Sequence, residues 1–276
     1  MNNLIENVSW QGYLCPLDSK PKLFETCFNC KHDVCDIPVL RSMGKPFPVY
    51  EDEYHVTELV GPPLIMKFKR ENPYYMEPDN ALFMMIGTAV HEKIDRENGS
   101  LTDFTKLHEY KIRYGLDPYT IVGTMDYVDF TSGLIQDYKC LGAWKTDDLR
   151  KKALNGTLNE DEYGLQLNGY RAWGFPEATQ LRLHCIIRDY NGRTAGTYKL
   201  ESQQMRINVP IVDNGYMDDL ARTNIEESLK DVPRMCTPEQ RWVNRKTGKF
   251  VRCASFCPVR TCPNYGGPQY NPEDVT

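Results

Sequence analysis

The sequence lacks the features of membrane and secreted proteins. No apolar run approaches the roughly 18 residues that a transmembrane helix needs. The first residues, Met1 to Glu6, carry neither the basic nor the apolar region of a secretion signal. Internal repeats and low-complexity tracts are also missing. We therefore expect a globular cytoplasmic protein that does not bind a membrane.

The sequence also has no excess of basic over acidic residues. The 276 residues include 33 Lys and Arg against 38 Asp and Glu, which gives a formal net charge of −5. Proteins that hold nucleic acid by electrostatics alone usually carry a positive charge. The balance therefore argues against a purely electrostatic DNA binder. It argues little against a nuclease, whose catalytic site is itself acidic and whose basic groups can be local.

Cysteine, in contrast, is abundant. Eight of the ten cysteines form two groups near the ends of the chain: Cys15, Cys27, Cys30 and Cys35, then Cys236, Cys253, Cys257 and Cys262. Without a secretion signal, such groups favour metal thiolates over disulfides. The other two, Cys140 and Cys185, lie alone in apolar or strand-like runs, and we interpret them as small buried residues.

The spacing within each group suits a site of four thiolates. The first group contains a CxxC pair, Cys27 and Cys30, and we interpret it as a zinc site, with His32 as an alternative ligand. The second group fits either tetrahedral zinc or a four-iron cluster. A full thiolate shell has no open position, so neither metal is expected to be catalytic. Scattered reduced cysteines are the alternative interpretation.

Between the cysteine groups, hydrophobic patterning predicts alternating helices and strands. Helices are predicted at about 57–70, 80–96, 160–173 and 213–229, and strands at about 107–114, 119–130, 133–140, 179–190 and 196–208. This order is typical of an α/β or α+β sandwich. We expect a cysteine-rich metal-binding extension over 1–50, a core over 51–232, and a cysteine metal knuckle and tail over 233–276.

Two acidic residues and a lysine lie in a predicted hairpin. The strands on either side of a turn at 131–133 carry Asp126 and Asp137. Because side chains alternate along a strand, Asp137 and Lys139 share one face. Singly, each would be an ordinary solvated residue. Together, two carboxylates and an ammonium suit a divalent ion and a water that attacks phosphate.

Four segments, in order, resemble the motifs of RecB-like PD-(D/E)xK nucleases. This family includes the small CRISPR adaptation nuclease and many phage exonucleases. The segments are Gly87-Thr-Ala-Val-His91-Glu, Gly123-Thr-Met-Asp126, Asp137-Tyr-Lys139 and Gln166-Leu-Asn-Gly-Tyr170. The resemblance covers about 55–210 and implies a restriction-endonuclease-like α/β core, with a central mixed sheet flanked by helices. Cys140 stands where the family often has Thr or Gly.

The resemblance implies a role for each matching residue. The ligands it implies for Mg²⁺ or Mn²⁺ are His91, Asp126, Asp137 and the carbonyl of Tyr138. Lys139 would orient or deprotonate the attacking water and stabilise charge on the phosphate. Gln166 and Tyr170, one turn apart on a helix, would face the DNA and help to hold the site. Glu109 is a further candidate for an acidic ligand.

A second nucleic-acid contact is predicted between the late cysteines. The segment from Arg241 to Arg252 carries five basic residues, two interleaved aromatic residues and no acid. Basic side chains can grip phosphates while an aromatic ring stacks on a base. The contacts we assign here are Arg241, Trp242, Arg245 and Lys246. A solvated hairpin on the metal knuckle is the alternative interpretation.

Together these features predict a divalent-metal-dependent deoxyribonuclease. We expect an exonuclease that acts on DNA ends or single strands in recombination, repair or phage DNA processing, with other recombination or replication proteins as partners. Three alternatives share the same core: a catalytically silent DNA-binding or scaffolding module, a structure-specific endonuclease and an RNase. Phosphate chemistry is common to the last two, and strand choice depends on surface shape.

Overall fold

The computed structural model describes residues 4–5, 10–32, 35–43, 49–98, 105–243, 247–260 and 262. The chain forms two compact units, each assembled from separated segments. Unit 1 comprises residues 1–52, 61–85 and 224–276, and unit 2 comprises residues 53–60 and 86–223. The sequence-based division at residues 50 and 232 stays a prediction.

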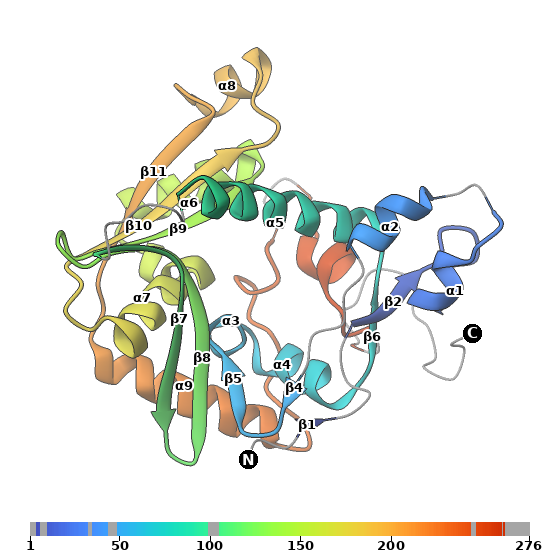
Figure 1. Ribbon diagram of the computed structural model, residues 1–276, viewed down its shortest axis with the longest axis horizontal. Helices are drawn as coiled ribbons and strands as arrows, with labels where there is room; N and C mark the ends of the chain where they lie inside the picture. The colour runs from blue at the N-terminus through green and yellow to red at the C-terminus, as the bar shows by residue number, and fades with distance from the viewer. Residues whose placement is uncertain are drawn as a thin grey trace. The chain divides into compact units, whose positions relative to one another are not determined.

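Unit 2 is built on a mixed sheet (Figure 1). Its strands are β5 (Glu53–His55), β7 (Lys106–Leu116), β8 (Tyr119–Asp129), β9 (Leu134–Leu141), β10 (Gln180–Ile187) and β11 (Gln204–Val209). Within the described residues the order is β11-β10-β9-β8-β5, and β7 also pairs with β8. The β9–β10 and β5–β8 pairs are parallel, and the other pairs are antiparallel.

Helices pack against this sheet, so the predicted α/β architecture with a mixed sheet and flanking helices is confirmed. The helices of unit 2 are α3 (Val56–Leu59), the second half of α5 (Pro78–Asn98), α6 (Ala143–Leu154), the 3-10 turn η1 (Leu158–Glu160), α7 (Glu162–Gly174), α8 (Gly192–Tyr198) and most of α9 (Asn214–Leu229). Helix α7 contacts β7, β8, β9 and β10, and α6 contacts β10 and β11. Alternate residues of β10, from Leu181 to Ile187, are almost fully buried. This is expected for a strand, because successive side chains point to opposite faces of the sheet.

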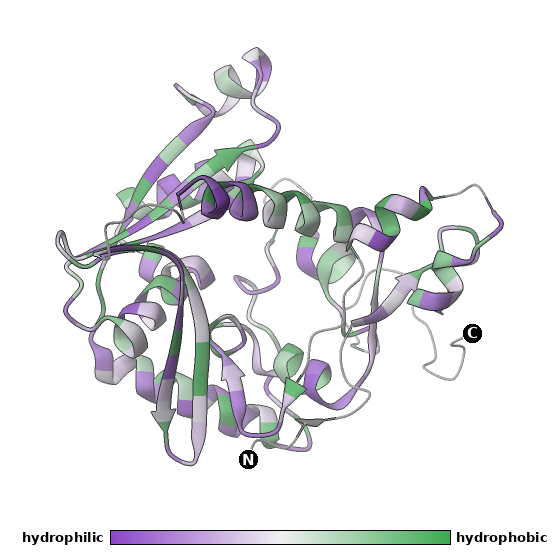
Figure 2. Ribbon diagram, in the orientation of Figure 1, coloured by the Kyte–Doolittle hydropathy of each residue, from purple (hydrophilic) through white to green (hydrophobic). Residues whose placement is uncertain are grey.

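Unit 1 combines short strands and helices. Its elements are β1 (Leu4–Ile5), β2 (Trp10–Leu14), β3 (Pro21–Leu23), α1 (Phe24–Phe28), α2 (Ile37–Met43), β4 (Val49–Tyr50), α4 (Pro63–Glu71), β6 (Tyr74–Met76), the start of α5, the end of α9 and the π-helix η2 (Arg252–Phe256). Trp10, Tyr13, Leu40 and Ala81 belong to one buried cluster. Ala81 comes from the apolar first turns of α5, whose last turns are strongly hydrophilic (Figure 2).

Two predicted elements were wrong in detail, each for a local reason. The helix predicted at 57–70 is two helices, because Pro62 and Pro63 end one and begin the next. The strand predicted at 196–208 begins only at Gln204, and α8 precedes it. Asn191 starts α8 by accepting hydrogen bonds from two backbone amides. Among the described residues, no helix has the length and apolar character that crossing a bilayer requires.

Close packing under α7 gives a stability prediction. A Cβ at Gly164 would lie 1.9 Å from the carbonyl oxygen of Leu158, a backbone atom that cannot swing aside. We expect Gly164→Ala to lower the free energy of unfolding by about 2 kcal/mol, measured by urea denaturation. The matched control is Gly192→Ala in α8, where nothing lies within 4 Å; its change should stay within about 0.5 kcal/mol. Equal stability of the two variants would contradict this packing.

Candidate functional site

The candidate site begins where the ladder between β8 and β9 ends. Their pairing stops at Tyr127 and Gln136. Beyond that pair, the backbone N–H of Tyr138 donates to Oδ2 of Asp126 at 2.7 Å, in place of a backbone carbonyl. A side chain thus replaces the strand as hydrogen-bond partner. This bond fixes the carboxylate of Asp126, which is only 9% exposed.

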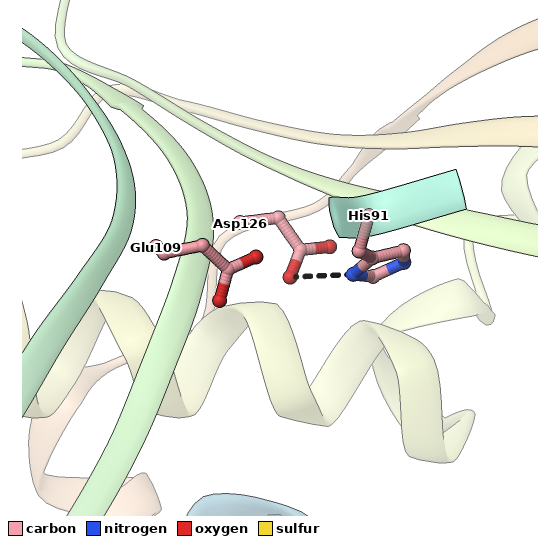
Figure 3. A group of neighbouring side chains, drawn as sticks. All are labelled: His91, Glu109 and Asp126. Carbon is pink, nitrogen blue, oxygen red and sulfur yellow. Dashed lines mark ion pairs between the residues drawn. The ribbon is translucent and has the colours of Figure 1, made fainter. Parts of the chain in front are cut away.

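His91, on α5, presents one ring nitrogen to Asp126 in a defined tautomer. Its Nε2 lies 2.9 Å from the carbonyl oxygen of Tyr138. A carbonyl only accepts hydrogen bonds, so Nε2 carries the proton. Nδ1 lies 3.4 Å from Oδ1 of Asp126 (Figure 3). In the neutral ring Nδ1 is therefore an acceptor that faces a carboxylate, an arrangement that needs a proton or a metal cation between them. The hydrogen bond with Asp126 accordingly raises the pKa of His91.

Glu109 supplies a second carboxylate from β7. It lies between the His108–Tyr127 and Tyr110–Met125 pairs of the β7–β8 ladder. Its φ of 50° is in the left-handed region, which a non-glycine residue seldom adopts and which costs about 1 to 3 kcal/mol. One ligand atom each from His91, Glu109 and Asp126 lie within 4.8 Å of one another. Burial, reinforced by the charge of Asp126, raises the pKa of Glu109. The backbone strain and the repulsion from Asp126 therefore both act on Glu109.

Asp137 and Lys139 form a buried ion pair on β9. Nζ of Lys139 lies 2.8 Å from Oδ2 of Asp137, whose side chain is 2% exposed. Burial raises the pKa of the Asp137 carboxyl despite the neighbouring ammonium. Burial acts to lower the pKa of Lys139, but the charges of Asp137 and Asp126 outweigh it and raise that pKa. The cationic form of the lysine is favoured. The role of Asp137 as a metal ligand stays a prediction.

Helix α7 holds this ion pair from one face. The side-chain amide of Gln166 donates to Oδ1 of Asp137 at 3.4 Å and to the hydroxyl of Tyr170 at 2.9 Å. Gln166 and Tyr170 are both buried beside Asp137, and their predicted role in holding the site stays a prediction. Their contact with DNA stays a prediction. Tyr163, one turn earlier on α7, was not predicted; its ring centre lies 5.2 Å from Nζ of Lys139.

The four late cysteines lie in unit 1 as free thiols. Cys257 is buried beside Ile65, and Cys236 and Cys262 pack against the same apolar cluster. Burial, together with the charges of other cysteines in this group, raises the pKa values of Cys236, Cys253 and Cys257. A bound metal cation would instead favour the thiolate forms of these residues.

The basic segment between these cysteines uses its aromatic rings internally. The guanidinium of Arg241 lies 5.0 Å from the ring centre of Phe250. That of Arg252 lies 4.8 Å from the ring of Trp242. Val243 and Phe250 form an antiparallel bridge, so the segment is a hairpin. Two of the predicted DNA contacts lie outside the described residues: Arg245 and Lys246.

Comparisons with known proteins give only distant similarity. No family model and no curated protein matches the sequence. The crystal structure of SSO0001 aligns with a TM-score of 0.46 at 18% identity, over 78% of this chain and 88% of that one. A phage related exonuclease from Haemophilus somnus 129PT aligns with a TM-score of 0.35 at 13% identity, over 53% of this chain and 68% of its own.

The ligand geometry predicts how Mn²⁺ binding responds to substitution. Glu109→Gln removes the negative charge of one ligand, and His91→Ala removes a ligand nitrogen. We therefore expect each to lower Mn²⁺ affinity at least about 10-fold by isothermal titration calorimetry. Glu92→Gln is the matched control, since Glu92 follows His91 on α5 and is exposed. An unchanged affinity in Glu109→Gln would remove Glu109 from the metal site.

Proposed function

We propose that this protein is a divalent-metal-dependent nuclease with a restriction-endonuclease-like core of the RecB-like type, and that it hydrolyses phosphodiester bonds of DNA. One observation carries the proposal. A ring nitrogen of His91 faces Asp126, and ligand atoms of His91, Glu109 and Asp126 lie within 4.8 Å of one another, beside the buried pair of Asp137 and Lys139. An imidazole nitrogen and two carboxylates that lie this close can hold a cation.

The donor set fits Mg²⁺ or Mn²⁺. Carboxylate oxygens suit both ions, and an imidazole nitrogen suits Mn²⁺ better than Mg²⁺. His91, Glu109 and Asp126 would hold the ion, with Asp137 and the carbonyl of Tyr138 as further predicted ligands. When bound, such an ion lowers the pKa of a water ligand and neutralises charge on the phosphate.

The residues around the donor set prepare it for phosphate chemistry. Lys139 is held by Asp137 and lies over the ring of Tyr163. Its ammonium would orient the attacking water and stabilise the negative charge that develops on the phosphate oxygens. Gln166 fixes Asp137. Because this carboxylate is already positioned, little reorganisation is needed when substrate binds.

The basic and aromatic hairpin supports a substrate with unpaired bases. Trp242 and Arg241 lie in this hairpin, where contacts with Arg252 and Phe250 hold their planar groups in place. Planar side chains of this kind can also stack on bases in single strands. We therefore propose an exonuclease that acts on ends or single strands in recombination, repair or phage DNA processing, beside recombination or replication proteins.

The late cysteines belong to the same proposal as a closed metal site. They would hold Zn²⁺ or an iron–sulfur cluster. Either metal would fasten the hairpin to the rest of unit 1. Nε of Arg241 already donates to the carbonyl of Cys236. Four thiolates leave no open coordination position, so this metal would act on structure and not on phosphate.

The nuclease proposal is tested with purified protein, Mg²⁺ or Mn²⁺, and end-labelled single- and double-stranded DNA. We expect Lys139→Ala and Asp126→Asn each to lower the cleavage rate at least about 100-fold, because each removes a group that stabilises the transition state. Lys230→Ala is the matched control, since this lysine is 57% exposed and pairs only locally with Glu227. It should cleave as fast as the wild type.

The other outcomes of this assay separate the alternatives. Equal rates in wild type, Lys139→Ala and Asp126→Asn would assign the activity to a contaminant and refute the proposal. Bound DNA without cleavage in either metal would favour the catalytically silent module. Cleavage of a matched RNA but not of DNA would make the protein an RNase.

The hairpin contact gives a separate binding prediction. Trp242→Ala removes a stacking surface worth about 1 to 3 kcal/mol per base, so the Kd for single-stranded DNA should rise about 10-fold or more. Binding is measured by fluorescence anisotropy with Ca²⁺ in place of the catalytic ion. Trp144→Ala is the control, because Trp144 is exposed and lies on α6, outside the hairpin. If the two variants bind alike, the hairpin is not a DNA contact.

A further inference from the structure

We infer that Cys15, Cys27, Cys30 and Cys35 form a closed Zn²⁺ site that is separate from the late cysteines and fastens the first segment of unit 1. All four line one cavity of about 470 Å³. Nothing in the proposed nuclease chemistry uses these residues, so the inference stands apart from that proposal.

The four thiols lie where short elements meet. Cys15 directly follows β2, Cys27 lies in α1, Cys30 follows the end of α1, and Cys35 precedes α2. The N–H of Cys15 donates to the carbonyl of Lys20 and closes the turn between β2 and β3. One ion bound by all four would tie this hairpin to both helices.

The CxxC turn already has the hydrogen bonds of a metal knuckle. The N–H of Cys30 donates to the carbonyl of Cys27 at 3.2 Å, which closes the turn. The N–H of His32 donates to Sγ of Cys30 at 3.4 Å. Backbone donors aimed at sulfur stabilise thiolates and orient metal ligands. His32 therefore contributes its amide to this turn, and we assign the four ligands to the cysteines.

The two cysteine groups pack in different places. Cys27 and Cys35 pack in the apolar cluster around Trp10 and Tyr13. Cys236, Cys257 and Cys262 pack in the separate cluster that contains Ile65. The Cys27–Cys30 and Cys30–Cys35 spacings, with two and four intervening residues, both fall within the range of zinc ligands.

Zinc binding would draw the early thiols closer than they are in this structure. In the described part of the chain, no three cysteine sulfurs lie within 4.8 Å of one another. Zn–S bonds are about 2.3 Å long, so a tetrahedral site needs closer sulfurs. Cys15, Cys30 and Cys35 are only partly buried, whereas Cys27 is buried, so the site would require their side chains to turn toward Cys27.

The surrounding elements explain why a metal is needed. Helix α1 has five residues and β3 has three, too few to be stable through local hydrogen bonds alone. Their shared core centres on Trp10 and Tyr13, which pack edge to face. Small cores of this size commonly depend on a bound metal or disulfides. The four thiols that lie in or beside these short elements assign that role to Zn²⁺.

The test is the metal content of the full-length protein by inductively coupled plasma mass spectrometry. We expect the double variant Cys27→Ser/Cys30→Ser to lose about one Zn²⁺ per chain and to keep the metal of the late group. The matched double variant Cys253→Ser/Cys257→Ser should lose the metal of the late group and keep the Zn²⁺ of the early group. Cys140→Ser, outside both groups, and His32→Ala should keep both metals.

Several results would overturn the inference. These are unchanged zinc in Cys27→Ser/Cys30→Ser, loss of iron instead of zinc in that variant, and loss of zinc in His32→Ala. A measurement that leaves the early cysteines intact covers the case in which the first variant does not fold. Zinc-edge X-ray absorption of Cys253→Ser/Cys257→Ser should show four sulfurs at about 2.3 Å. Absence of zinc, or a mixed sulfur and nitrogen shell, would refute the site.

Discussion

The candidate site depends on the two backbone groups of Tyr138. Where β9 stops pairing with β8, the N–H and the carbonyl of this residue lose their ladder partners. Buried backbone groups need a hydrogen-bond partner, and here both find one in a side chain. The N–H binds the carboxylate of Asp126, and the carbonyl binds the ring of His91. One peptide segment thus sets the position of the carboxylate and the tautomer of the imidazole.

Electrostatics explains why these groups belong around a cation. Glu109, Asp126 and Asp137 bring three carboxylates into one neighbourhood, and Lys139 neutralises only part of their charge. Burial and mutual repulsion raise the pKa values of Glu109 and Asp137. Glu109 also has a strained backbone conformation, with φ in the left-handed region. Backbone strain and repulsion between buried charges are typical of sites that bind a ligand or carry out a reaction. A divalent ion would offset the repulsion between these carboxylates.

The sequence was sufficient for features that depend on local pattern. Alternation and the turn at 131–133 predicted β8, β9 and the shared face of Asp137 and Lys139, while helical spacing placed His91 on α5. It was insufficient where position depends on register between strands. Glu109 lies near His91 and Asp126 because of the β7–β8 register and its own left-handed conformation, and no local pattern encodes either property. Tyr163 could have been found from its spacing, three residues before Gln166 on the same helix.

The discontinuity of unit 1 has a consequence for how the protein is made. Its last segment starts at residue 224, whereas the segments of unit 2 end at residue 223. On the ribosome, the whole sheet of unit 2 is therefore synthesised before unit 1 has its full set of segments. The early cysteines are synthesised before this sheet, and the late cysteines are synthesised after it. The two thiol groups would therefore become available to bind metal at separate stages of biosynthesis.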